Sequence, residues 1–234
     1  MKSMRRISSL LLMPLFLLSC GKEAALSNAE RLHKAYLDSI EATEDKIRPL
    51  VNLLPSDERL IWNESKDRVL LFSLHRFPSS YPEGETVTNT WGDAWLCSLK
   101  EYKQWYLDNK SNIADPLLRT KQVLGMDESS KNTYISSMWF DPADVIRPAY
   151  VTDPTKPMKT SFEENATDEY KAWFSSQYYY SYDVAHLPWT RLGYTYDWSA
   201  EAKDRYGLSE FLSQKGTTFV VDKTMLVTDW VKTF

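Results

Sequence analysis

Residues 68–76 read RVLLFSLHR, and this stretch decides the fold. Alternate side chains of an extended chain point to opposite sides. One side carries Val69, Leu71, Ser73 and His75, and the other carries Leu70, Phe72, Leu74 and Arg76. Because both sets are largely apolar, the stretch predicts a strand that is covered on both faces and lies in the centre of its sheet.

Other segments with strand character surround this one. A polar turn at 64–67 separates it from residues 59–63, which predicts a hairpin. A second hairpin is predicted near the C-terminus, where a Gln-Lys-Gly turn separates residues 208–212 from 217–221. The remaining predicted strands are 86–91, 94–97 and 134–140.

Helix start signals lie between these segments. Ser27 and Glu30 have the spacing of a capping box, and an apolar stripe at helical spacing continues to Ile47. This pattern predicts an amphipathic helix that ends near Arg48, because Pro49 disfavours helix in the residue before it. Three further starts are predicted at Ser98, at Asp115 and at Thr167 or the neighbouring Asp168.

Helices and strands intermix without a regular βαβ repeat, which indicates the α+β class. We expect residues 27–234 to form a single α+β domain, with a small, mainly antiparallel sheet and several packed helices. The amphipathic helix that begins at Ser27 forms the N-terminal element of this domain.

The N-terminal residues have the three-part pattern of a secretory signal. Lys2, Arg5 and Arg6 precede a mostly apolar run, and Ser19 precedes Cys20. A transmembrane helix is the alternative, but the twelve residues 7–18 reach only about 18 Å, against a hydrocarbon core of about 30 Å. Residues 1–19 are therefore predicted to be a signal peptide.

Residues 17–20 read LLSC and resemble a bacterial lipobox. The resemblance implies that Cys20 is lipidated, that residues 20–26 are a lipidated tether and that the protein is anchored to a membrane of the cell envelope. It would face the periplasm or the exterior. Gly21 after Cys20 resembles lipoproteins of the outer membrane, if the organism has one.

Charge and cysteine content narrow the function classes. Loss of residues 1–19 removes three of the 28 basic residues and none of the 32 acidic ones, which leaves a net charge of −7. This acidic balance argues against a nucleic-acid partner. Cys97 would be the single remaining thiol, and its apolar neighbours predict a small buried residue rather than a nucleophile, which would need a nearby base.

Common catalytic and cofactor motifs are missing from the sequence. The seven glycines form neither a dinucleotide-binding nor a Walker pattern. There is also no nucleophile elbow and no paired-histidine zinc motif, and the three histidines are isolated from one another. We therefore expect no cofactor and no metal.

The segment 183–198 combines titratable, cationic and aromatic residues in an irregular stretch, which is typical of recognition loops. The predicted binding residues are Asp183, His186, Trp189, Arg191, Tyr194, Tyr196, Asp197 and Trp198. In this hypothesis Arg191 points into an aromatic-lined concavity. In the structural alternative Arg191 pairs with Asp183 or Asp197, and in an enzymatic alternative His186 acts with an acidic partner.

Glu210 lies on a predicted strand before the C-terminal turn. This arrangement is similar to the C-terminal element of ADP-ribosyltransferases, in which the glutamate engages the NAD ribose. Arg76 and the pair Ser136 and Ser137 could supply the other two parts. Leu208 stands where that family usually has an acidic residue or Gln, so the likeness is incomplete.

A broader resemblance covers residues 86–221. Its most specific part is PWTRLGYTYDW at 188–198, followed by GLSEF at 207–211. With this signature the chain resembles a family of uncharacterised bacterial proteins, which implies a common domain but no reaction.

Taken together, these features predict a lipid-anchored cell-envelope protein that binds a small molecule or a protein partner. Two alternatives stay open at this point. One is an envelope enzyme that uses His186, and the other is an immunity-like lipoprotein that neutralises a toxin in the periplasm.

Overall fold

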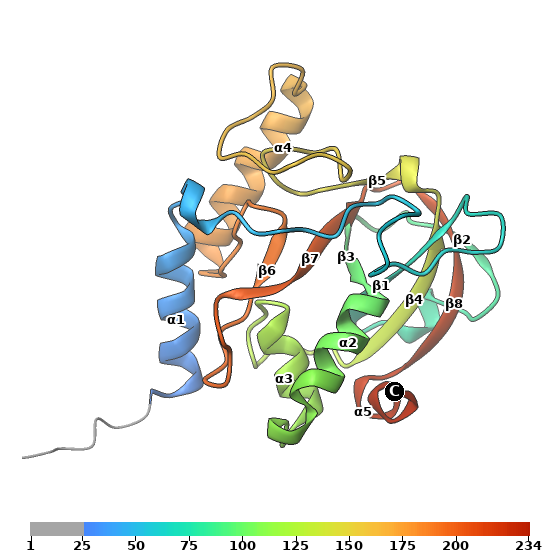
Figure 1. The fold of residues 1–234 in the computed structure, drawn as a ribbon, viewed down its shortest axis with the longest axis horizontal. Helices are drawn as coiled ribbons and strands as arrows, with labels where there is room; N and C mark the ends of the chain where they lie inside the picture. The colour runs from blue at the N-terminus through green and yellow to red at the C-terminus, as the bar shows by residue number, and fades with distance from the viewer. Residues whose placement is uncertain (1–25) are drawn as a thin grey trace, which may run out of the picture.

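The computed structural model describes residues 26–234 (Figure 1). The predicted signal peptide, Cys20 and nearly all of the tether lie outside the described residues. The strands of this part are β1 (Val69–His75), β2 (Thr86–Thr88), β3 (Ala94–Ser98), β4 (Tyr134–Phe140), β5 (Val145–Ile146), β6 (Tyr194–Tyr196), β7 (Tyr206–Ser213) and β8 (Thr218–Leu226). The α-helices are α1 (Asn28–Ser39), α2 (Leu99–Asn109), α3 (Pro116–Val123), α4 (Asp168–Tyr179) and α5 (Val227–Trp230), and none within 26–234 is both long and apolar enough to span a bilayer.

One antiparallel sheet of eight strands organises the domain. The strand order is β2-β8-β4-β1-β3-β7-β5, and β6 pairs with β7 outside this path. All seven residues of β1 are buried and the strand lies at the centre of the sheet, as its two apolar faces predicted. The described chain is a single α+β domain, which confirms the predicted fold class.

The sheet curls strongly on itself. Residues 214–217 alone join β7 to β8, although three strands lie between them in the sheet. A chain of this length reaches about 18 Å, whereas four strand spacings in a flat sheet span about 19 Å before any offset along the strands. The predicted C-terminal hairpin is therefore wrong, because β7 pairs with β3 and β5 while β8 pairs with β4 and β2.

Each face of the curled sheet has its own core. On one face Leu71, Met138 and Phe211 pack with residues of the long segment that follows α1, such as Val51 and Leu53. On the other face the sheet packs against residues of α2, α3 and α5 (Figure 1). Cys97 belongs to this second core and is buried, as predicted.

The N-terminal helix begins as predicted but ends early. Ser27 and Glu30 form the complete capping box, yet α1 stops at Ser39 rather than near Arg48. The carbonyl groups at its C-terminus are bound by distant side chains, since Arg191 donates to the carbonyls of Ser39 and Ile40. Bonds from these side chains replace the bonds that a further helical turn would have supplied.

The predicted hairpin at 59–63 and 68–76 forms only its turn and a single bridge. The Asn63 side chain closes the turn by accepting from the backbone N–H groups of Asp67 and Arg68. Beyond the bridge between Trp62 and Val69, the first segment cannot pair further with β1, because β3 and β4 occupy both of its edges. The other predicted helix starts are confirmed, with Ser98, Asp115 and Thr167 as N-caps of α2, α3 and α4.

A fully buried arginine connects the outer segments to this framework. Arg147 is 0% exposed and donates to the carbonyls of Val51, Asp153, Pro154 and Lys156. Its aliphatic part lies against Gly193, which has a φ of +77°. A Cβ at Gly193 would lie 2.5 Å from Cδ of Arg147, so only glycine fits there.

We predict that Gly193→Ala lowers the free energy of unfolding by about 2–4 kcal/mol, because left-handed backbone strain adds to an overpacked contact. Gly84→Ala is the matched control: its φ is +80°, but no atom lies within 4 Å of a Cβ there. Its cost should be confined to backbone strain, about 1–2 kcal/mol. Urea unfolding followed by tryptophan fluorescence measures both, and equal losses would contradict the proposed packing constraint.

Candidate functional site

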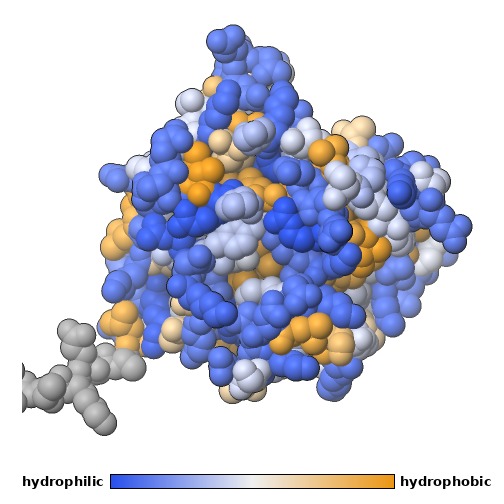
Figure 2. Space-filling model, in the orientation of Figure 1, coloured by the Kyte–Doolittle hydropathy of each residue, from blue (hydrophilic) through white to orange (hydrophobic). Residues whose placement is uncertain are grey.

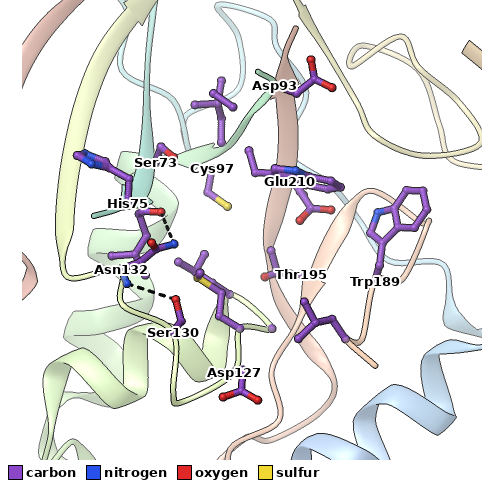
Figure 3. Close-up of a pocket in the computed structure, with 18 of the residues that line it drawn as sticks. Ser73, His75, Asp93, Cys97, Asp127, Ser130, Asn132, Trp189, Thr195 and Glu210 are labelled. Atoms are coloured by element: carbon purple, nitrogen blue, oxygen red, sulfur yellow. Dashed lines mark hydrogen bonds between the residues drawn. The ribbon is translucent and has the colours of Figure 1, made fainter. Parts of the chain in front are cut away.

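A cleft of about 500 Å³ opens beside the end of β1 and the start of β3. Its other walls are residue Glu210 of β7, the loop 124–127 after α3, and parts of the segment 180–196 (Figure 3). This volume lies in the range of pockets that bind small organic molecules.

Aromatic side chains from separate segments make up much of the cleft wall. They include Tyr81, Trp91, Trp95, Tyr180, Trp189 and Tyr196. Trp189 belongs to a packed group of rings, with its centroid 4.8 Å from that of Phe174 and 6.1 Å from that of Trp95. This packing holds the Trp189 ring in place before any ligand arrives.

Glu210 is the main polar feature of the cleft. It is 8% exposed and sits in the middle of β7, directly opposite Cys97 of β3. Its Oε2 has no hydrogen-bond partner among the described residues. Burial raises the pKa of Glu210 from 4.5 to about 8, because water no longer stabilises the charged carboxylate.

The strand around Glu210 is held firmly by neighbouring groups. The Glu210 N–H donates to the carbonyl of Gly193 at 2.9 Å. Next to it, the Ser209 N–H donates to the carboxylate of Glu101 on α2 at 2.9 Å. The backbone at Glu210 is therefore fixed, and its side chain is directed towards the cleft, as Figure 3 shows.

A second buried polar group lies across the cleft from β7. Trp189 is 6% exposed, and its indole Nε1–H has no acceptor among the described residues. An unpaired buried donor costs about 1–3 kcal/mol, and a ligand with an acceptor atom could recover that cost. The cleft thus offers an unpartnered carboxyl group and an unpartnered N–H.

Cys97 lines the same cleft but is not an activated nucleophile. Burial raises the pKa of its thiol well above 9, and the nearby carboxyl groups of Glu210 and Glu101 act in the same direction. A thiol attacks as the thiolate, so Cys97 is protonated and unreactive at neutral pH.

His75 is also a neutral wall residue. Burial lowers its pKa to about 4. Its Nδ1 accepts from the Phe77 N–H at 3.2 Å, so the single ring proton lies on Nε2 and is donated to Ser136 Oγ at 2.7 Å. Ser136 then hydrogen-bonds to Thr224 Oγ1 at 2.7 Å. His75 cannot take a proton from Ser136 in this arrangement.

The structure divides the predicted binding residues into two groups. Trp189, Tyr194 and Tyr196 line the cleft, whereas Asp183, His186, Arg191, Asp197 and Trp198 do not. Two of the second group still support the site. Trp198 donates from Nε1 to the carbonyl of Met126 at 3.0 Å, and Asp197 pairs with Arg119 at 2.5 Å, which together hold the loop 124–127.

Arg191 belongs to the scaffold and does not point into the cleft. It is 5% exposed, and its guanidinium donates to the carbonyls of Ser39 and Ile40 and to the hydroxyl groups of Tyr150 and Tyr182. The alternative pairing with Asp183 or Asp197 does not occur either, because Arg119 takes Asp197. Neither prediction for Arg191 considered that backbone carbonyls can accept the hydrogen bonds of a buried guanidinium.

His186 lies at the surface with a φ of +51°, and its ring is 5.1 Å from that of Tyr36. No carboxylate of the described chain bonds to it, so the pair that the enzymatic alternative requires is not formed. Within residues 26–234 no group of three or more His, Cys, Asp or Glu side chains is arranged to hold a metal ion.

The residues of the ADP-ribosyltransferase likeness are only partly together. Arg76 and Glu210 both line the cleft. Ser136 is bonded to His75, and Ser137 donates to Asp222 at 2.7 Å. The sequence pointed to Glu210 as a ligand contact only through this likeness, although a carboxylate between Leu208 and Leu212 on the core-facing side of an apolar strand was a further usable signal.

We predict that Glu210→Gln changes how stability depends on pH. In the parent the unfolded chain loses this proton near pH 4.5 and the folded chain near pH 8, so the folded state binds more protons between these values. The free energy of unfolding therefore falls as pH rises through this window, by at most about 1.4 kcal/mol per pH unit. The measurement is urea unfolding from pH 5 to 9. The free energy of unfolding of the variant, relative to that of the parent, should rise with pH up to about pH 8 and stay constant above it. Parallel curves would show that Glu210 ionises normally.

We predict that Arg191→Ala lowers the free energy of unfolding by about 2–4 kcal/mol, because it leaves buried carbonyls without donors. Arg76→Ala, at the exposed mouth of the cleft, is the control and should change it by no more than about 0.5 kcal/mol. Thermal melts of both variants test this assignment. A small effect of Arg191→Ala would return Arg191 to the list of possible ligand contacts.

No family model matches the chain, and neither a curated protein nor a solved structure is significantly similar to it. The function of the cleft is therefore inferred from its own residues.

Proposed function

We propose that this chain is a lipid-anchored cell-envelope protein that binds a small organic molecule in the cleft between β3, β7 and the segment 180–196. The observation that carries this proposal is the pair of buried, unpartnered polar groups in an aromatic-lined cavity, Glu210 Oε2 and Trp189 Nε1. Such groups cost free energy in an unoccupied protein, and a complementary ligand would recover it.

The chemistry of the cleft favours binding over catalysis. The thiol of Cys97 is protonated, and the ring of His75 is neutral and committed to hydrogen bonds with Phe77 and Ser136. Neither residue is hydrogen-bonded to a carboxylate within residues 26–234. The groups that stay free, Glu210 and Trp189, are suited to hold a ligand in one orientation.

A small molecule fits the cleft better than a protein partner. Stable protein interfaces bury a broad surface with an apolar centre. On the face shown in Figure 2, hydrophilic residues dominate and hydrophobic residues form small, separate patches. Several aromatic side chains, among them Trp91, Trp95 and Trp189, instead line the walls of the cleft.

The anchor part of the proposal comes from the sequence. The LLSC ending of the signal pattern supports lipidation of Cys20. Each buried methylene of an acyl chain contributes about 0.8 kcal/mol to membrane binding, so several chains on one cysteine hold a domain firmly. The net charge of −7 that follows removal of residues 1–19 argues against a nucleic-acid partner.

We predict that Leu187→Trp, which adds bulk to the cleft wall, weakens binding of any cleft ligand at least tenfold. Leu37→Trp is the control, because Leu37 lies on the exposed side of α1 and does not line the cleft. The measurement is a thermal-shift screen of small organic molecules against the three proteins, with hits quantified by calorimetry. Hits that bind both variants and the parent equally would place the ligand elsewhere.

We predict that Cys20→Ala abolishes palmitate labelling in a bacterial host and leaves an uncleaved precursor, because processing of a lipobox requires the modified cysteine. Cys97→Ala is the control and should keep both labelling and processing. A Cys20→Ala protein that is still processed and still partitions fully into detergent would contradict the anchor.

A further inference from the structure

The titratable side chains around the cleft are mostly acidic, and at neutral pH Asp93 and Asp127 carry the negative charges. Three carboxyl groups line it, those of Asp93, Asp127 and Glu210, against one cationic side chain, Arg76 at the exposed mouth. His75 does not add a positive charge, because burial lowers its pKa to about 4. An anionic ligand would therefore meet unfavourable potential inside the cleft.

Asp93 and Glu210 differ in what they can offer a ligand. The two oxygens of Asp93 accept from Trp173 Nε1 at 2.7 Å and from the Lys215 N–H at 3.0 Å. Glu210 has no such partner for Oε2, and it is the more deeply placed of the two. A ligand that pairs with a carboxylate in this cleft would thus pair with Glu210.

We propose that the cleft ligand is an organic amine whose ammonium group pairs with the Glu210 carboxylate and whose acceptor atom receives the Trp189 Nε1–H. This inference rests on the small-molecule cleft proposed above. Aromatic faces attract cations, most strongly when both are removed from water, so the tryptophan and tyrosine side chains in the wall favour the same ligand class. An ammonium group in turn needs a carboxylate when it is buried, and Glu210 supplies one.

Proton exchange accompanies this pairing. At neutral pH Glu210 carries a proton in the empty cleft, since its pKa lies near 8. When the ammonium group binds, the O–H bond of Glu210 breaks, the proton passes to solvent and the resulting carboxylate pairs with the cation. Binding near pH 6.5 therefore releases about one proton, and binding at pH 9 releases almost none.

The other groups near Glu210 do not produce this signal. The thiol of Cys97 on β3 and the hydroxyl of Tyr170 on α4 both have pKa values raised by burial, so neither loses a proton below pH 9. His75 on β1 titrates near pH 4. Burial also raises the pKa of Glu101 on α2, but Glu101 does not line the cleft and accepts from the Ser209 N–H and the Tyr206 hydroxyl. The charged groups on the cleft rim are Arg76, Asp93 and Asp127.

The test uses two matched sets of probes that differ in the terminal group. One set is tyramine, 4-ethylphenol and 3-(4-hydroxyphenyl)propionate, and the other is tryptamine, 3-ethylindole and indole-3-propionate. Calorimetry at pH 6.5 is performed in phosphate and in MES, a buffer that carries a sulfonate and is no primary amine, and their different ionisation enthalpies report the number of protons released. We expect at least one amine to bind, to release about one proton, and to gain affinity up to about tenfold per pH unit towards pH 8.

Variants then assign the signal to Glu210. Glu210→Gln should weaken binding of that amine at least about thirtyfold and remove the proton release. Asp127→Asn, which removes a carboxylate at the cleft rim, should weaken it less than about threefold. Leu187→Trp should abolish it.

The remaining outcomes separate the two proposals. One outcome is that no amine binds, while neutral or anionic probes bind to the parent and not to Leu187→Trp. This outcome overturns the amine inference and supports the small-molecule cleft. Amine binding that Glu210→Gln leaves unchanged also overturns the inference. If no probe and no molecule of the thermal-shift screen binds in the cleft, both proposals fail.

Discussion

The buried guanidinium of Arg147 is the constraint on which much of this domain depends. No carboxylate of residues 26–234 pairs with it, and the carbonyls of Val51, Asp153, Pro154 and Lys156 surround it instead. Burial lowers its pKa to about 10, so it remains charged at neutral pH and must keep these acceptors. The two long segments that follow α1 and β5 are thereby tied to each other.

The same arginine connects the scaffold to the cleft. Its aliphatic part packs against Gly193, where no Cβ fits. The carbonyl of Gly193 accepts from the Glu210 N–H at 2.9 Å, which helps to fix the strand position of the cleft carboxyl group. The geometry of the cleft is in this way coupled to the buried charge of Arg147.

Glu210 differs from the other buried charged residues of the described chain in how its charge is satisfied. Arg119 and Asp197 pair with each other, and Lys121 donates to the carbonyls of Glu128 and Ser130. Arg147 lacks a partner for Nε alone, whereas no hydrogen bond within residues 26–234 reaches the carboxyl group of Glu210. The protein tolerates this by keeping the group protonated, and a cationic ligand would allow it to ionise.

Local patterns in the sequence determined the central strand, the capping box of α1 and the α+β class. These depend on alternation and on side chains within a few residues, such as the apolar faces of residues 68–76 and Ser27 with Glu30.

Tertiary structure alone decided the pairing of β7 and β8, the early end of α1 and the place of Arg191. Each of these depends on a partner far away in the chain: β3 and β4 for the sheet, and Ser39 and Ile40 for Arg191. The cleft is of the same kind, because Trp189 and Glu210 come together only when the sheet curls and the segment 180–196 folds across it. Sequence spacing does not tell which buried polar group will find a hydrogen-bond partner. In the folded chain Arg147 and Arg191 donate to backbone carbonyls, whereas Oε2 of Glu210 has no partner among the described residues.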